Sequence, residues 1–516
     1  MSEDVSFFAY IFDDSPEHKA RASKPYAFPK TTLKDIHDAV PKWCHEKKTF
    51  TSLYYVGRTL LWGTVFFTFA LCIPTLTSLL EPFGPRVQWW AKAFMWTQYW
   101  WWQSMVGCGI WTLAHEAGHM TLSPYPWVCH AIGWTLHCLV LVPYYGWRYS
   151  HALHHKATNS IERDENFCPS TRSDFGLPPQ QEALPSVYEE ILQEAPIVVF
   201  FRVLLQQVLG LEAYLIVNAL GNRSYPKGTN HYLVNSPLFK TDASKTAVLG
   251  CNIGMITMLY VLYRFAKATS WGYLGVIYFV PWFLTNHWIV ALVFLQHTDP
   301  TVPHYRKGAW TFLRGATCTI DRPLLGWMGR YFLHNISHDH VAHHFFSQIP
   351  FYHQPYVTQA IKKVLGDDYC YDGTNTYRSI WRNFTQCQFV EDEGDVVFYR
   401  DRKGVPTRVM EGSVGNGVDE HEGRRNGING TKVEDKGPVD FLDDTEKYGE
   451  GQLCEMSKSV VHSATRGPHA RSEYIVPVSS GAACSVQCKD FWSPKLLKAL
   501  KYNNADGPAS RKCLHR

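Results

Sequence analysis

Histidine is the residue type that stands out in this sequence of 516 residues. Eight of the 24 histidines fall in three short clusters, HEAGH at 115–119, HALHH at 151–155 and HVAHH at 340–344. These eight are His115, His119, His151, His154, His155, His340, His343 and His344. On a helix, side chains at positions i and i+4 share one face, and i+3 lies close beside them. Each cluster therefore predicts two or three imidazoles that point to the same place.

The number of imidazoles indicates the kind of metal site. Structural and catalytic zinc sites take about three or four protein ligands, so eight converging imidazoles exceed what one zinc ion uses. Imidazole also binds iron, and a pair of iron ions with four or five ligands each would use about eight or nine. The three clusters therefore favour a dinuclear iron site.

The first cluster leaves a second interpretation open, because HEAGH also fits the HExxH pattern of zinc metalloproteases. In a protease, His115 and His119 would bind zinc and Glu116 would be the general base. An intramembrane protease would need one further ligand, and it would leave both HxxHH clusters unexplained. In the iron interpretation, Glu116 instead holds a ligand imidazole through its other ring nitrogen.

Four apolar stretches would position these clusters as the ends of membrane-spanning helices. They form two hairpins, 59–80 with 93–114 and 246–263 with 271–294, and each stretch is about long enough to cross the hydrocarbon core. Lysine and arginine are more frequent just before the first stretch than in its distal turn, which predicts a cytosolic N-terminus. Four spans return the chain to the cytosol near residues 115 and 297, so all three clusters are expected on that side.

Two further apolar stretches call for helices that do not cross the membrane. The stretch 125–146 separates two clusters that must share one side, so we expect it to be re-entrant or interfacial. The stretch 197–220 is interrupted by Arg202, Gln206, Gln207 and Glu212, which favours an amphipathic helix on the membrane surface. The predicted fold is therefore an all-α integral membrane protein with four transmembrane helices, interfacial helices and a cytosolic histidine-rich cap that holds the iron pair.

Composition agrees with this fold and divides the chain into three parts. Apolar residues make up 46% and aromatic residues 15%, and the net charge of +4 gives no reason to expect nucleic acid as a partner. Residues 1–58 are predicted to form a cytosolic N-terminal segment, 59–403 the membrane domain with the metal site, and 404–516 a polar, glycine-rich tail that is disordered. The first twenty residues lack the features of a secretory signal, so insertion is expected to depend on internal spans.

The three clusters, their order and their placement after two hairpins resemble those of membrane-bound fatty acid desaturases. Flanking sequences such as HEAGHMTLSPYPWV, LVPYYGWRYSHALHHKATNSIERDENFCP and LTNHWIVALVFLQHTDP are similar to fungal oleate (delta-12) desaturases and their omega-3 relatives. The resemblance extends over residues 20–400.

This resemblance implies a set of metal ligands. The eight clustered histidines would bind the iron pair, and His297, at the end of the last span, would be a ninth ligand. Val293 stands where acyl-CoA desaturases have an asparagine that contributes through water, so that part of the shell does not carry over. Ala117 replaces the cysteine of the commoner HECGH, which leaves ligation intact.

The resemblance also implies the reaction and its partners. It points to an oxygen-dependent desaturase that introduces a cis double bond at delta-12 of oleoyl groups carried by phospholipid or coenzyme A. The sequence has no HPGG motif, and His340 rather than glutamine heads the third cluster. A separate electron donor is therefore implied, cytochrome b5 with its NADH-dependent reductase, in the endoplasmic reticulum membrane. Omega-3 or dual specificity, hydroxylation and acetylenic-bond formation stay open as alternatives.

Other residues near the clusters are expected to play supporting roles. His334 and His338 are also four apart, and we expect them behind the ligands or at the surface. Asp164 and Glu165, which follow the second cluster, either polarise a ligand histidine or lie in a solvated loop. The aromatic run YWWW at 99–102 is expected in an interfacial belt or in helix packing.

Overall fold

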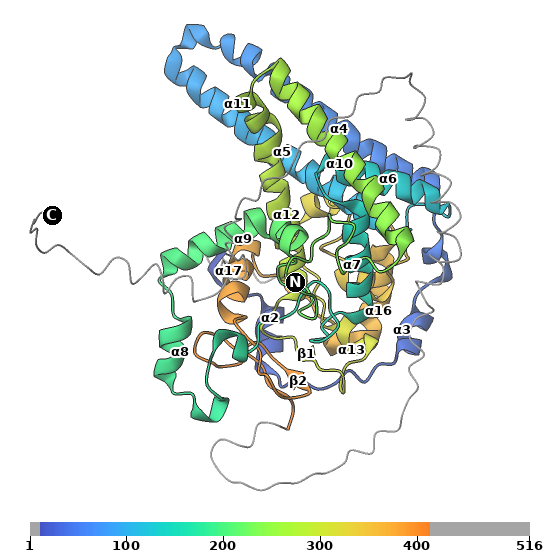
Figure 1. Cartoon of the computed structure of the whole chain (residues 1–516), viewed down its shortest axis with the longest axis vertical. Helices are drawn as coiled ribbons and strands as arrows, with labels where there is room; N and C mark the ends of the chain where they lie inside the picture. The colour runs from blue at the N-terminus through green and yellow to red at the C-terminus, as the bar shows by residue number, and fades with distance from the viewer. Residues whose placement is uncertain (1–10, 413–516) are drawn as a thin grey trace, which may run out of the picture.

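The structure is a computed structural model that describes residues 11–412. These residues are mostly helical (Figure 1), and the strands named among them are β1 (His304–Tyr305) and β2 (Val396–Val397), which pair antiparallel with His304 opposite Val397. The predicted all-α class is confirmed. Residues 413–516 of the predicted tail lie outside the described residues.

The first hairpin consists of α4 (Thr49–Ser78) and α5 (Pro85–Gly118). Gly84, with a φ of 91°, reverses the chain between them, and Pro85 begins α5. The helices have 30 and 34 residues, so at 1.5 Å per residue each is about 45–50 Å long. This length exceeds the hydrocarbon core of about 30 Å. The C-terminal end of α5, with His115, can therefore lie beyond the membrane core.

The second hairpin begins with α10 (Asp242–Ala268) and returns through three consecutive elements. These are α11 (Trp271–Leu274), the π turn η5 (Gly275–Phe279) and α12 (Val280–His297). Two carbonyl oxygens of the π turn accept hydrogen bonds from α5, that of Ile277 from the Tyr99 hydroxyl (2.6 Å) and that of Val276 from Trp100 Nε1 (2.8 Å). The aromatic run at 99–102 thus takes part in helix packing.

The two hairpins lie side by side (Figure 1), because α5 and α12 approach each other closely. A Cβ atom at Gly107 would lie 2.2 Å from the Thr285 hydroxyl oxygen, so only glycine fits there. Nearby, Trp288 Nε1 donates a hydrogen bond to the Ser104 hydroxyl (3.1 Å). These two contacts join the middle parts of α5 and α12.

Length and composition identify four candidate membrane spans among the described residues, although not the same four as the sequence predicted. They are α4, α9 (Pro196–Val217), α10 and the continuous stretch Trp271–His297. Helix α5 is absent from this set because its tryptophan, tyrosine and glutamine residues lower its hydropathy. It nevertheless packs antiparallel along α4 (Figure 1), so it must cross the same layer. Helix α9 meets the test by composition, but in Figure 1 it runs across the direction of α4, α5 and α10, as a surface helix would.

The stretch between the first two clusters is bent, as expected for a re-entrant or interfacial segment. It forms α6 (Pro126–Leu139) and α7 (Tyr144–Ala157), whose axes differ by 111°. The bend returns the chain so that α7 packs against both α5 and α6. The second cluster, on α7, therefore meets the first cluster, on α5.

Shorter helices surround the ends of α5 and α12. The α-helices are α2 (Pro16–Ser23), α3 (Leu33–Ala39), α8 (Pro185–Leu192), α13 (Phe312–Thr317), α14 (Trp327–Phe332), α15 (His340–Phe345), α16 (Gln354–Leu365) and α17 (Thr376–Gln386). The 3-10 turns are η1 (Lys42–His45), η2 (Glu81–Phe83), η3 (Ser173–Phe175), η4 (Gln180–Glu182) and η6 (Gly366–Asp368).

A buried set of charged side chains, which we call the ionic cluster, joins these elements to the end of α12. Arg322 donates hydrogen bonds to Asp299 (2.9 Å) and Asp372 (2.6 Å), and Arg382 donates to Asp372 (2.7 Å) and Asp299 (3.3 Å). His18 of α2 lies 3.8 Å from Asp299 and 3.7 Å from Asp372. All five residues are at most 4% exposed. The N-terminal segment is thus tied to residues far along the chain.

Residues 404–412, which composition assigned to the tail, pack against the N-terminal segment. The amide of Tyr26 donates to the carbonyl of Val409, and the amide of Glu411 donates to the carbonyl of Tyr26, both at 2.7 Å. The described fold thus extends past the predicted boundary at residue 403.

Candidate metal centre

Nine histidines meet where four helices end. Helix α5 and its C-cap contribute two, α7 three, α12 one and α15 three. They are His115, His119, His151, His154, His155, His297, His340, His343 and His344. These are the eight clustered histidines together with His297, which the family resemblance had added.

The nine histidines form two groups. The first group contains His115, His119, His151, His155 and His343, whose nearest ring nitrogens all lie within 4.8 Å of one another. The second contains His154, His297 and His344, again within 4.8 Å, and His340, whose Nε2 is 2.9 Å from Nε2 of His297. Each HxxHH cluster contributes to both groups, because adjacent residues on a helix point about 100° apart.

Within the groups, the ring nitrogens are spaced as ligands of one ion would be. Nε2 of His151 lies 2.9 Å from Nε2 of His115, 3.1 Å from that of His119 and 3.0 Å from that of His155. Two nitrogens that bind one metal at about 2.1 Å and at right angles are about 3.0 Å apart. The spacing therefore fits nitrogens that converge on a common point.

Carboxylates on the far side of the rings fix their orientation. Asp164 accepts a hydrogen bond from Nδ1 of His154 (2.7 Å) and further ones from the amides of Asn159 and Asn166, both at 2.9 Å. Burial alone would raise the pKa of Asp164, but His154 and these amides hold it below its usual range. Asp164 is therefore a buried carboxylate that orients a ligand, and not part of a solvated loop.

Glu116 plays the same part in the first group. Its Oε1 lies 3.2 Å from Nδ1 of His115 and 3.8 Å from Nδ1 of His343, and its Oε2 accepts a hydrogen bond from the Thr121 hydroxyl (2.9 Å). A protease base would have to face the metal-bound water, whereas Glu116 faces the opposite ring nitrogen. The arrangement supports the role of ligand partner and argues against the HExxH protease.

The donor set fits a pair of metal ions. Several ring nitrogens are buried and have no hydrogen-bond partner within residues 11–412, among them Nε2 of His343 and of His344. Burial lowers the pKa of His343 to about 3, so its imidazole is neutral at pH 7 and can act as a ligand. Neutral imidazoles with free lone pairs are what divalent iron or zinc requires, and nine of them suit two ions better than one.

An apolar cavity of about 260 Å³ opens beside the histidines. His115, His151, His154, His297 and His340 form part of its wall. Apolar side chains form most of the rest, including Trp111, Trp147, Phe167, Leu211, Ile289, Val290, Val293, Phe294 and Ile336. A long hydrocarbon chain could therefore lie against both histidine groups while water is excluded.

The structure also locates the other residues that the sequence singled out. His334 accepts a hydrogen bond at Nδ1 from Arg58 (3.4 Å), and its Nε2 lies 3.1 Å from the Thr59 hydroxyl. Neither His334 nor His338 belongs to the two groups. Glu165 accepts a hydrogen bond from Tyr225 rather than from a histidine. Val293 lines the cavity one turn before His297.

Two contacts at the site were not expected from the sequence. The Thr158 hydroxyl lies 3.1 Å from Nδ1 of His344, and Phe167 stacks on the ring of His297 with centroids 4.7 Å apart. Both residues lie within fifteen positions of the second cluster. Their closeness to that cluster is a signal, but it does not identify which side chain reaches which ring.

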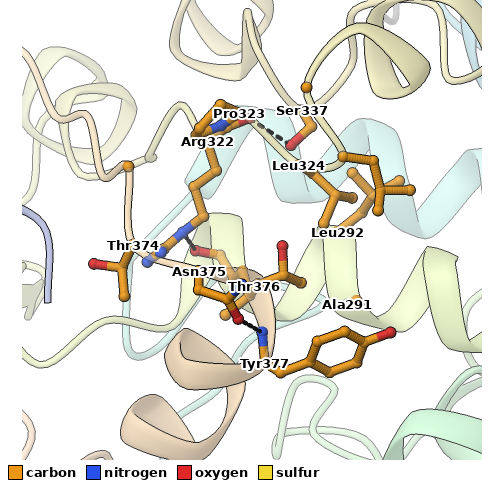
Figure 2. Close-up of a pocket in the computed structure, with 14 residues that line it drawn as sticks. Ala291, Leu292, Arg322, Pro323, Leu324, Ser337, Thr374, Asn375, Thr376 and Tyr377 are labelled. Atoms are coloured by element: carbon orange, nitrogen blue, oxygen red, sulfur yellow. Dashed lines mark hydrogen bonds between the residues drawn. The ribbon is translucent and has the colours of Figure 1, made fainter. Parts of the chain in front are cut away.

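A second pocket, of about 140 Å³, lies between α12 and the start of α17 (Figure 2). Leu292 lines both this pocket and the cavity beside the histidines. None of the nine histidines lines this second pocket. Arg322 extends along its wall, with its guanidinium engaged by Asp299 and Asp372. The charged group in this pocket is thus already neutralised within the protein.

Comparison with known proteins agrees with this geometry. A sequence model of the fatty acid desaturase family matches residues 87–375. A delta(12) fatty acid desaturase of Mortierella alpina is 40% identical over 387 residues, which are 74% of this chain and 94% of that protein. An oleate hydroxylase of Claviceps purpurea is 35% identical and covers 74% and 83% of the two chains. A protein of Brassica juncea named omega-6 fatty acid desaturase, endoplasmic reticulum, is 35% identical and covers 72% and 90%.

Proposed function

The chain belongs to the fatty acid desaturase family of membrane oxidoreductases, and from this premise we propose that it converts oleoyl groups to linoleoyl groups by introducing a cis double bond at delta-12. The observation that carries the proposal is the convergence of nine imidazoles, in two groups, along the wall of one apolar cavity. The delta(12) desaturase of Mortierella alpina, at 40% identity, supports the position of the double bond.

We assign a pair of iron ions to the two groups. His115, His119, His151, His155 and His343 would hold one ion, and His154, His297, His340 and His344 the other. When bound, reduced iron activates dioxygen and so supplies the oxidant that removes two hydrogens from the acyl chain. Electrons would come from cytochrome b5 and its NADH-dependent reductase.

The chain's own residues have three tasks in this reaction. Asp164 and Glu116 hold ligand imidazoles in one orientation, which keeps the ligands preorganised. Apolar side chains such as Ile289 and Phe294 hold the acyl chain against the histidines, so that one pair of carbons approaches the oxidant. The same side chains keep water away from it.

Location and organisation follow from the same premise. We propose that the protein resides in the endoplasmic reticulum membrane, as the name of the Brassica juncea relative indicates for that protein. The metal centre and both termini would face the cytosol. Residues 1–58 would be the N-terminal cytosolic segment, 59–403 the catalytic domain and 404–516 a tail.

The second candidate function is hydroxylation of oleate, which the Claviceps purpurea relative supports. Hydroxylation would use the same histidines, so the difference must lie in how the cavity places the acyl chain. Omega-3 or dual specificity is a further possible variation of the same site.

A yeast that makes oleate but no polyunsaturated acids gives a direct test. We expect expression of this chain to produce linoleate, identified by gas chromatography and mass spectrometry. A hydroxylated C18 acid in its place would favour the second candidate, and a trienoic acid would add omega-3 activity. An unchanged profile, with the protein present in the membranes, would contradict the proposal.

A further inference from the structure

Two arginines share one carboxylate at the rim of the cavity. Arg202, on α9, lines the cavity, and its side chain is 27% exposed, which places it at the opening. Its Nη1 donates a hydrogen bond of 2.6 Å to Oε2 of Glu194. Arg402, from the loop after β2, places Nη2 3.6 Å from the same oxygen.

Arg402 keeps donors that this carboxylate does not satisfy. Its Nε and Nη2 are buried and have no hydrogen-bond partner among the described residues. Burial lowers the pKa of Arg402, and the charge of Arg202 lowers it further, against the opposing effect of Glu194. Two guanidinium groups around one carboxylate, partly shielded from water, form a place where a further anion would be stabilised.

Helix α9 connects this place with the membrane on one face and with the metal centre on the other. Its outer face exposes apolar side chains next to Arg202, namely Ile197, Phe200, Phe201 and Leu204. Its inner face contributes Arg202, Gln206, Gly210 and Tyr214 to the cavity wall. Tyr214 donates a hydrogen bond to Ser150, the neighbour of His151. The twelve residues from Arg202 to Tyr214 rise by about 18 Å, so a long acyl chain fits along this face.

We propose that Arg202 and Arg402 form a binding site for a phosphate group of the acyl carrier, and that this phosphate displaces Glu194 when the acyl chain enters the cavity. Arginine is suited to this because its planar guanidinium can donate two parallel hydrogen bonds to phosphate. The inference rests on the proposed function, since it assumes an acyl substrate. Phospholipids and coenzyme A both carry phosphate, and the test distinguishes them.

Binding to the purified full-length protein in a neutral detergent tests the site without requiring turnover. The probes are dioctanoyl-phosphatidylcholine, oleoyl-coenzyme A and, as a phosphate-free control, monoolein, with affinity read from the quenching of tryptophan fluorescence. We expect Arg402→Gln to weaken binding of the phosphate-bearing probe by about tenfold. Arg402→Lys keeps the positive charge but not the forked pair of donors, so it should lose less affinity for that probe than Arg402→Gln does. Arg264→Gln, on the distal part of α10, is the matched control and should change nothing.

Glu194→Gln gives the sharpest result, because it should act in the opposite direction. Removal of the competing carboxylate is expected to tighten binding of the phosphate-bearing probe while monoolein binding stays the same. A response with phosphatidylcholine alone identifies a lipid headgroup, and a response with oleoyl-coenzyme A alone identifies that carrier. The proposal is overturned if Arg402→Gln and Glu194→Gln weaken all probes alike, or if neither changes any affinity.

The outcome is separable from that of the proposed function. Phosphate-dependent binding without linoleate in yeast would leave this site in place and remove the delta-12 assignment. Linoleate production together with unchanged affinities in all variants would support the delta-12 assignment and remove this phosphate site.

Discussion

Two buried polar clusters lie at the same end of α12, and they differ in how their polar atoms are satisfied. The two groups of histidines, which together we call the histidine centre, include His297. The ionic cluster includes Asp299, two residues further on. In the ionic cluster two carboxylates face two guanidinium groups, so the charges are balanced within the protein. In the histidine centre, ring nitrogens face one another, and several of them have no hydrogen-bond partner among the described residues.

This difference shows what identifies a metal site. His18, Asp299 and Asp372 also place ligand atoms within 4.8 Å of one another, as the two histidine groups do. Their carboxylates, however, already accept hydrogen bonds from Arg322 and Arg382. Proximity of ligand atoms is therefore not sufficient. Convergent ring nitrogens that no internal cation neutralises favour a metal site, whereas carboxylates already paired with arginines do not.

The largest expected effect is on the histidine centre. His154→Ala and His343→Ala each remove a ligand from one group, and we expect iron to fall from about two ions per chain to one or fewer with loss of detectable desaturation. Iron is measured by mass spectrometry on the purified protein and product by the yeast assay. His338→Ala, outside both groups, should retain iron. Full iron content in both ligand variants would contradict the assignment.

The ionic cluster should respond in stability rather than in metal content. Arg382→Met removes one of the two arginines that neutralise the buried carboxylates of Asp299 and Asp372, so we expect a loss of about 3–5 kcal/mol in unfolding free energy. The matched control is Arg378→Met on the same helix, because Arg378 lies 3.4 Å from Asp14 at a 35% exposed position and should lose less than about 1 kcal/mol. Thermal unfolding in detergent measures both. Equal losses of unfolding free energy in Arg382→Met and Arg378→Met would contradict the stabilising role of the ionic cluster.

A smaller effect is expected where a carboxylate supports the histidine centre. Asp164→Asn should weaken iron binding by about 10–100-fold, since it disturbs the orientation and basicity of His154. Glu165→Gln is the matched control, because Glu165 bonds Tyr225 instead, and it should bind iron as the wild type does. Competition with a chelator gives the affinities. If both variants behave alike, Asp164 has no role in orienting the ligand.

The smallest effect concerns the edge of the ionic cluster. Burial lowers the pKa of His18 below its usual 6.5, and the arginines add to this against the two carboxylates. The unfolded chain therefore binds a proton more readily than the native one, so this residue makes stability fall as pH drops below about 6.5. His18→Gln should reduce the loss of unfolding free energy below pH 6.5 by about 1 kcal/mol or less. Thermal unfolding between pH 5 and 8 tests it, and an unchanged slope would show that His18 does not contribute.

The histidine centre could be predicted from the sequence because its signals are local. His151, His154 and His155 share a helix turn, and repetition of that spacing around 340 identifies a second set. His297 came from family resemblance alone, and its place beside His340 depends on how α12 and α15 pack. Composition alone separates the spans from the surface helices less clearly, because the tryptophan-rich α5 lacks the hydropathy of a typical span whereas α9 has it.

The ionic cluster and the rim of the cavity could not be predicted, for a physical reason. His18, Asp299 and Arg382 come from distant parts of the chain, and each is an ordinary polar residue in its own neighbourhood. Their pairing is produced by tertiary packing, which has no sequence period. The same holds for Glu194 and Arg402, which meet only because the loop after β2 returns to α9.

The distribution of the ligands along the chain has a consequence for biosynthesis. The first histidine group takes four rings from α5 and α7 but its fifth from α15, and the second group needs His297 as well. Between His155 and His344 the ribosome adds 189 residues, which takes roughly 10–40 s at ordinary rates of synthesis. During that interval the first group has four of its five rings and the second has only His154, so neither group is complete. Occupation of both groups is therefore expected only after both hairpins have been inserted.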